Sequence, residues 1–142
     1  MAREITVVVE TGKDSFSCFM TKDSNDLGFL LIGAGKTAAK AVEDFFICRD
    51  GMREYYKKTG EVFPELEFRF IFDVGAFFSY YPLNITAFAK YIGMNASLLR
   101  QYASGHKTPK DKNLEKIRQG IAKVKSDIDA GLLIDRPVLQ YA

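Results

Sequence analysis

NITAFAKYIGMNASLLRQYASGHKTPKDKNLEKI, residues 84–117, alternates helix signals with turn signals. Asn84 is a good cap for a first helix, whose apolar residues recur at spacings of three and four. These residues are Ile85, Phe88, Ala89 and Ile92. Gly93 ends this helix, since the turn needs a backbone angle that a side chain would penalise, and Asn95 caps the next one. Two short helices separated by a glycine turn are therefore predicted.

The second helix is expected from about Ala96 to Ser104, with Leu99 and Tyr102 facing inward. Its outer face carries Ala96, Ser97, Arg100 and Gln101. Short side chains at the helix N-terminus permit close approach to a groove of DNA. Arginine can bond guanine bidentately, and glutamine can do the same for adenine. This pattern is typical of a helix-turn-helix that reads double-stranded DNA.

This segment also contains a set of residues whose types and positions form a characteristic pattern: Ala89, Gly93, Gly105, His106, Lys107, Pro109, Leu114 and Ile117. In type and spacing they resemble the helix-turn-helix of the phage-repressor (Cro-like) family, and the resemblance covers residues 84–128. That family usually has a small residue and Glu-Asn before the second glycine, where this chain has Tyr102, Ala103 and Ser104. For His106, in the basic loop, a phosphate contact and simple exposure both remain open. The predicted DNA-binding residues are Asn84, Asn95, Ala96, Ser97, Arg100, Gln101, His106 and Lys107.

Charge divides the chain into two halves. Residues 1–73 carry 10 Lys/Arg against 13 Asp/Glu, whereas residues 74–142 carry 10 against 5, which together give the net charge of +2. Short helix-turn-helix patterns also occur in helical bundles that never touch nucleic acid. A basic half joined to an acidic half favours the DNA-binding interpretation, because one half would meet phosphates and the other a different partner.

The first half carries strand signals. Residues 4–10 (EITVVVE) and 15–21 (SFSCFMT) are β-branched or aromatic with partial alternation, and TGKD between them supplies a hairpin turn. A third run, GFLLIG at 28–33, is apolar on both faces and is expected at the centre of the sheet. A helix is expected over 36–60, and the following strand, 66–73, alternates apolar and charged residues.

This order predicts the α+β class: a small antiparallel sheet with one covering helix, followed by an all-α helix-turn-helix domain. Thr37 would cap the covering helix and Gly60 would end it. The domain boundary is expected at Val74–Gly75, where the charge changes sign. The predicted domains are residues 1–74 and 75–142, and the segment 74–82 at their boundary is expected to form a short apolar helix that ends before Pro82.

The order of elements, and the segment IGAGKTAAKAVEDF at 32–45, are similar to the HicB antitoxin family. The resemblance covers nearly the whole chain. It implies a first domain with a partial RNase-H-like fold that holds a HicA-type toxin, an RNA-cleaving protein with a double-stranded-RNA-binding-like fold. It also implies a second domain that binds the operon's own promoter. No toxin-contacting residue follows from a motif.

GAGKT, residues 33–37, partly matches the phosphate-binding P-loop. The pattern anchored on Gly35-Lys36-Thr37 requires glycine at position 30, where this chain has Leu30. A bulky leucine does not readily take the backbone angles that let successive N–H groups wrap a phosphate. We therefore expect no nucleotide there, and Thr37 is interpreted as a plain helix cap.

No other segment predicts a catalytic, metal or cofactor site. Cys18 and Cys48 have no partner at metal-ligand spacing, so reduced thiols are favoured over a disulfide or a metal site. His106 is the only histidine and has no Cys or Ser nucleophile motif beside it. No apolar run could span a bilayer, and the N-terminus does not read as a signal peptide. We expect a cytoplasmic protein that is not an enzyme.

The segment 110–131 carries an apolar stripe at steps of three and four: Leu114, Ile117, Ile121, Val124 and Ile128. Part of this stripe, or the tail 132–142, would serve as the interface of a homodimer or higher homo-oligomer, because two-fold dimers double the DNA contact. Packing of the stripe entirely within its own domain is the alternative.

Two functions from different classes follow. The first is an antitoxin that binds operator DNA and a HicA-type toxin. The second is a stand-alone transcription regulator whose sheet domain senses a small molecule in a phenylalanine-lined pocket. A protein whose helices do not bind DNA is a third.

Overall fold

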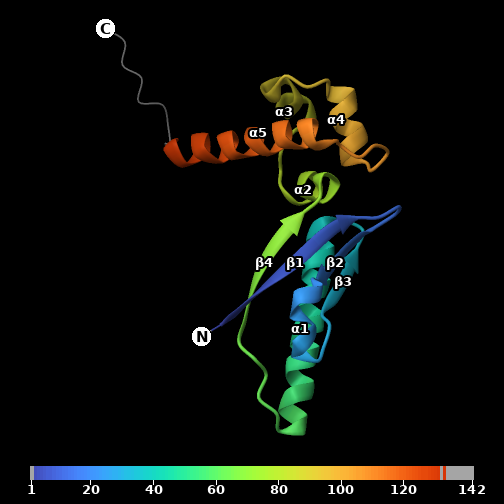
Figure 1. Cartoon of the computed structure of the whole chain (residues 1–142), viewed down its shortest axis with the longest axis vertical. Helices are drawn as coiled ribbons and strands as arrows, with labels where there is room; N and C mark the ends of the chain where they lie inside the picture. Colours follow the sequence, from blue (N-terminus) through green and yellow to red (C-terminus); the bar gives the residue numbers. More distant parts are fainter. Residues whose placement is uncertain (1, 132, 134–142) are drawn as a thin grey trace.

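The computed structural model describes residues 2–131 and 133. A sheet covered by one long helix forms one end of the molecule, and the remaining helices form the other end (Figure 1). The elements are β1 (Arg3–Thr11), β2 (Phe16–Met20), a 3-10 helix η1 (Lys22–Leu27), β3 (Ile32–Gly35), α1 (Ala38–Thr59), β4 (Leu66–Phe72), α2 (Val74–Tyr80), α3 (Ile85–Ile92), α4 (Ala96–Ala103) and α5 (Asp111–Ala130). The α+β class is confirmed.

The four strands form a mixed sheet in the order β3-β2-β1-β4. β2 is antiparallel to both β1 and β3, but β4 pairs with β1 in parallel. The prediction of an antiparallel sheet is therefore wrong for β4. The reason is the connection: α1 carries the chain from the end of β3 back along the sheet, so that β4 runs in the same direction as β3 and β1.

The third strand also differs from its prediction over 28–33 at the sheet centre. It is β3, Ile32–Gly35, and it forms an edge of the sheet. Leu31 is fully buried, whereas Leu30 and Ile32 are 58% and 54% exposed. A run that is apolar on both faces does not distinguish a central strand from an edge strand whose outer side chains stay uncovered.

The core of the sheet lies between its strands and α1. Phe45 of α1 is fully buried, and its ring centroid is 5.1 Å from that of Phe68 and 6.0 Å from that of Phe70 on β4. The Thr37 hydroxyl accepts a hydrogen bond from the Lys40 N–H at 3.1 Å, and Gly60 ends the helix with a φ of 77°. Both predicted helix ends are confirmed.

The glycines before α1 have a packing role. A Cβ built on Gly33 would lie 2.8 Å from the Cα of Phe45, and one on Gly35 would lie 2.7 Å from the backbone N of Ala41. Because no side chain fits there, β3 approaches α1 closely. The glycines of the GAGKT segment are therefore explained by close packing of strand against helix.

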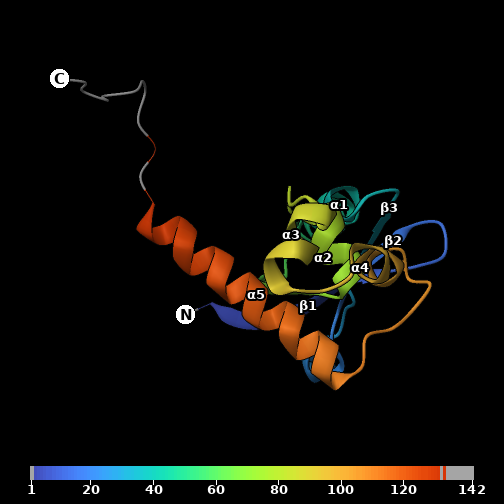
Figure 2. The ribbon, with the colours of Figure 1, turned by 90° about the horizontal axis from the view of Figure 1, so that it is seen from above.

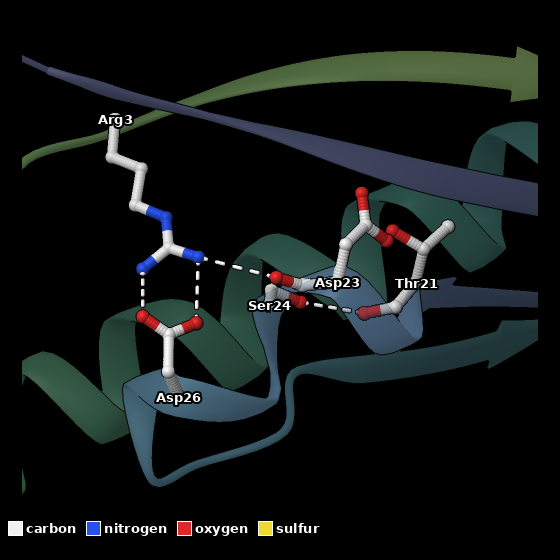
Figure 3. Close-up of polar contacts among 5 residues, drawn as sticks. All are labelled: Arg3, Thr21, Asp23, Ser24 and Asp26. Atoms are coloured by element: carbon white, nitrogen blue, oxygen red, sulfur yellow. Dashed lines mark hydrogen bonds and ion pairs between the residues drawn. The ribbon is translucent and has the colours of Figure 1, made fainter.

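The 3-10 helix η1 was not predicted from the sequence. It is tied to β1 by Arg3, whose guanidinium donates two hydrogen bonds to the Asp26 carboxylate, at 2.6 and 2.7 Å, and one to the Asp23 carbonyl at 3.3 Å (Figure 3). The Ser24 hydroxyl donates to the Thr21 carbonyl at 2.7 Å, which closes the turn. These contacts hold the connection between β2 and β3 against the start of the sheet.

A second, smaller core joins α2, α3, α4 and α5. Its buried residues are Phe78, Phe88, Ala89, Leu99, Tyr102 and Ile117. α2 contributes Phe78 to this core and Ala76 to the core of the sheet. α5 crosses beneath α3 and α4 and continues beyond them, as both views show (Figures 1 and 2).

The junction between the two cores is tight at Gly75. A Cβ there would meet the Thr11 hydroxyl of β1 and would lie 2.6 Å from the Ala103 carbonyl of α4. The Asp73 carboxylate accepts hydrogen bonds from the Thr11 N–H and hydroxyl and from the Ala76 N–H, at 2.7 to 2.8 Å. The ends of β1 and β4 are thereby fixed to the start of α2.

Candidate nucleic-acid interface

The turn between α3 and α4 is held by backbone and side-chain caps. The Asn84 side-chain oxygen accepts a hydrogen bond from the Ala87 N–H at 2.8 Å, and that of Asn95 accepts one from the Leu98 N–H at 3.1 Å. Gly93 ends α3 with a φ of 70°, as its position predicts. Both asparagines are exposed, and each retains an amide NH₂ group that can donate to a phosphate.

α4 is anchored by its inner face. Leu99 and Tyr102 are buried, as predicted, and the Asn113 amide of α5 donates a hydrogen bond to the Tyr102 hydroxyl oxygen at 2.8 Å. The Lys116 ammonium of α5 donates to the Gly93 carbonyl at 3.1 Å. α5 thus fixes the position of α4 and of the turn before it.

The outer face of α4 carries most of the predicted base-reading residues. Ser97 and Arg100 are exposed, Gln101 is half-buried, and Ala96 packs partly against the helical core. The Arg100 Nη2 donates a hydrogen bond to the Thr86 hydroxyl at 2.6 Å. Since a guanidinium has five N–H donors, this contact orients Arg100 across the turn and leaves donors for a base.

The loop after α4 begins at the C-terminal end of this helix. Gly105 has a φ of 82°, and the Lys107 N–H donates to the Gln101 carbonyl at 3.1 Å. The His106 Nδ1 lies 2.7 Å from the Ser104 hydroxyl oxygen, and both side chains are exposed. The loop therefore presents His106 and Lys107 next to the C-terminal end of α4.

The segment that forms α3, α4 and the following loop is basic. Residues 74–110 contain no aspartate or glutamate, and their cations are Lys90, Arg100, Lys107 and Lys110. Positive side chains attract a phosphate backbone. α5 adds carboxylates beside this segment, and its Asp127 accepts a hydrogen bond from the Tyr91 hydroxyl of α3 at 3.0 Å. The sequence interpretation missed Thr86 and Lys116, because each acts through a residue more than ten positions away along the chain.

A cleft of about 540 Å³ lies between the end of the sheet and the helical core. Its lining includes Phe77 of α2, Lys107 of the basic loop, and Arg118 and Ile121 of α5. Most phenylalanines of the sheet domain pack against one another and against α1, while Phe72 lines this cleft. Any small-molecule site of this chain is better sought at the junction.

Within residues 2–131 and 133, no group of side chains is arranged to hold a metal ion, and no helix is long and apolar enough to cross a membrane. Cys18 and Cys48 are free thiols, and burial raises the pKa of Cys18 to about 12. No protein-family model matches the chain, and neither a curated protein nor a solved structure matches it.

Proposed function

We propose that this chain is the antitoxin of a HicA/HicB-type toxin–antitoxin system. In this proposal it neutralises an RNA-cleaving toxin by protein contact and represses its own promoter as a DNA-binding protein. The observation that carries the proposal is the capped α3–turn–α4 unit, with Ser97 and Arg100 exposed on the outer face of α4, joined to an acidic sheet domain.

The DNA-binding part of the proposal rests on how α4 is presented. Its inner face is fixed by α5, so its outer face is free to enter a major groove. Arg100 and Gln101 would contact base edges, while Lys107 and the helix caps would contact phosphates. Such binding has two requirements. Positive side chains hold the protein in place on the phosphate backbone, and a helix in a fixed position brings its outer side chains to the base edges.

The toxin-binding part rests on the sheet domain. Residues 1–73 carry more acidic than basic side chains, which complements the basic surface expected on an RNA-binding toxin.

A homodimer is part of this proposal. The apolar stripe of α5 is buried at Ile117, half-buried at Ile121 and Val124, and 67% exposed at Ile128. The stripe therefore leaves the core of its own domain toward the C-terminal end, where a second copy would cover it. Apart from Leu133, the tail 132–142 lies outside the described residues, so the expectation that it serves in the interface stays a prediction.

The direct test is binding to the DNA just upstream of the gene, measured by fluorescence anisotropy across a salt series against a scrambled duplex. Arg100→Ala is expected to cost about 1–3 kcal/mol at one base position, and Lys107→Ala to weaken both duplexes similarly with a flatter salt dependence. Arg53→Ala, on α1, is the matched control and should bind as the wild type does. Equal losses on both duplexes for Arg100→Ala would contradict the base-reading role.

The alternative is a transcription regulator that senses a small molecule, and the cleft at the domain junction favours it. Lys107 lines that cleft and belongs to the basic loop, so an occupant there would alter a proposed phosphate contact. Native mass spectrometry of the purified chain tests it. A co-purifying small molecule that weakens DNA binding would favour the sensor, and its absence together with a tightly bound basic protein would favour the antitoxin.

A further inference from the structure

The face of the sheet opposite α1 carries one large apolar residue in each strand. In β1 the outward residues are Glu4, Thr6, Val8 and Glu10, so that Val8 stands among polar neighbours. In β4 the outward residues are Glu67, Arg69 and Ile71. β2 and β3 place Phe19 and Ile32 on this same face. A sheet face that only meets water is expected to carry polar residues at such positions.

The strand register brings these four residues into one line. Ile71 of β4 pairs with Val8 of β1, Val8 pairs with Phe19 of β2, and Phe19 pairs with Ile32 of β3. Directly opposed residues in neighbouring strands have Cβ atoms about 4.5–5.5 Å apart, so the side chains form a continuous apolar row across the sheet. We call Ile71, Val8, Phe19 and Ile32 the apolar row.

The apolar row is left uncovered by the rest of the described chain. Ile71 and Ile32, at its two ends, are 46% and 54% exposed, and Val8 and Phe19 between them are half-buried. α1 lies on the other face of the sheet (Figure 1). Cross-strand packing within the row contributes only about 0.2–1 kcal/mol per pair, so it does not account for apolar residues in all four strands. Contiguous exposed apolar patches with a polar rim mark interaction sites.

The polar residues around the row carry more negative than positive charge. Directly beside the row, Glu10 lies on one side, and Thr6 and Arg69 lie on the other. Glu4 and Glu67 follow two residues further along β1 and β4, and Arg69 and Glu4 form an ion pair of 3.7 Å. Three carboxylates therefore stand against one guanidinium. A second copy of this face would bring carboxylates against carboxylates, which like-charge repulsion disfavours. A partner with an apolar ridge between lysine or arginine side chains would match both the row and its rim.

We propose that the apolar row is the docking site for a small basic protein, which buries Val8, Phe19, Ile32 and Ile71 and places cations beside Glu10 and Glu67. This inference rests on the proposed antitoxin function, because an RNA-binding toxin has the required basic surface, and it assigns that contact to the uncovered face of the sheet. The partner contact is then on the sheet and the DNA contact on α3 and α4, which are two different regions of the chain.

The test is isothermal titration calorimetry of the full chain with the purified small basic protein encoded beside its gene. Ile71→Asp and Ile32→Asp place a charge in the row, and both positions are exposed enough to leave folding intact, which circular dichroism and the Tm would verify. The matched control is Ile47→Asp, since Ile47 is 61% exposed on α1, on the covered side of the sheet. Each row variant is expected to raise the Kd by about tenfold or more, and Ile47→Asp by less than about twofold.

The possible outcomes distinguish a failure of the proposed docking site from a failure of the proposed antitoxin function. Wild-type binding that both row variants leave unchanged would overturn the docking site while preserving the antitoxin proposal. No binding by the wild type would overturn the antitoxin proposal and the basic occupant together. If Ile71→Asp instead converts a dimer of the chain alone into a monomer in sedimentation equilibrium, the row is covered by a second copy and the inference of a basic partner is wrong.

Discussion

The sheet region and the helical region of this chain are stabilised in different ways. The sheet has the larger core, which is centred on Phe45 and includes the pairing of β1 with β4, two strands that are distant in sequence. The helical core is smaller, and each of its short helices α3 and α4 depends on a side-chain cap such as Asn84 or Asn95. Large losses of stability are therefore expected in the interior of the sheet, and moderate ones at the helix ends.

The surfaces of the two regions also differ. The outer face of α3 and α4 is positive and polar, as a phosphate backbone requires, whereas the uncovered face of the sheet is apolar with an acidic rim. One chain thus presents two surfaces of opposite charge, connected through α2. This difference supports the proposal that the chain binds two partners of different chemistry.

Phe45→Ala should have the largest effect on stability. It removes a fully buried ring that contacts Phe46, Phe68 and Phe70, and the cost is expected to be about 3–5 kcal/mol in the free energy of unfolding. Urea unfolding followed by circular dichroism measures it. Leu30→Ala, at an exposed position, should change stability by less than about 0.5 kcal/mol. Equal effects of the two substitutions would contradict the assigned core.

Gly75→Ala tests the contact between the two regions. The added Cβ would meet Thr11 of β1 and Ala103 of α4, and overpacking of this kind costs about 1–3 kcal/mol. Gly51→Ala is the control, because a Cβ there meets no atom within 4 Å and alanine is the better helix former, so stability should rise by about 0.4–1 kcal/mol. Thermal unfolding would give the Tm of both variants. An unchanged Tm for Gly75→Ala would contradict a tight contact between the two regions.

Asn95→Ala tests the caps of the helical region. It removes the acceptor for the Leu98 N–H, and the loss of an N-cap costs about 1 kcal/mol. Asn95→Ser should retain most of the stability, since a serine hydroxyl also caps. Chemical unfolding compares the two variants. If they unfolded alike, the side chain would not act as a cap.

The smallest effect is expected at Arg3. Its hydrogen bonds to the ionised carboxylate hold the pKa of Asp26 below the ordinary value. Because this pKa is depressed in the folded state, the stabilisation is present above the unfolded-state pKa and is lost as the pH falls through the folded-state value. In Arg3→Gln, an NMR titration should find the pKa of Asp26 raised toward its ordinary value. An unchanged pKa would contradict the contact of β1 with η1.

The helical region could be predicted almost element by element from the sequence. Asn84, Gly93 and Asn95 each mark a helix end through a local backbone requirement, so the positions of α3 and α4 follow from residues within one turn. The outward positions of Ser97 and Arg100 follow in turn from helical periodicity. The contact of Arg100 with Thr86 could not be predicted, because it depends on the angle between two helices.

The sheet was predicted only in part. Its strands and α1 carry local signals, but the parallel pairing of β4 with β1 depends on where α1 returns the chain. The edge position of β3 depends on which neighbour pairs with β2. η1 has no periodic apolar pattern and is held by Arg3, far away in the sequence. The apolar row was missed for the same reason, since it exists only in the final register of four strands.

The most direct test measures binding at both proposed surfaces, the DNA-binding face and the apolar row, in one assay. Fluorescence anisotropy of the upstream DNA, with the small basic protein encoded beside the gene added in a second step, would be measured for Arg100→Ala and Ile71→Asp. We expect Arg100→Ala to lose selective DNA binding but to bind the protein in calorimetry. We expect Ile71→Asp to bind DNA but to need about tenfold or more of the basic protein for the second step. Loss of both activities in both variants, with the fold intact, would contradict two separate surfaces.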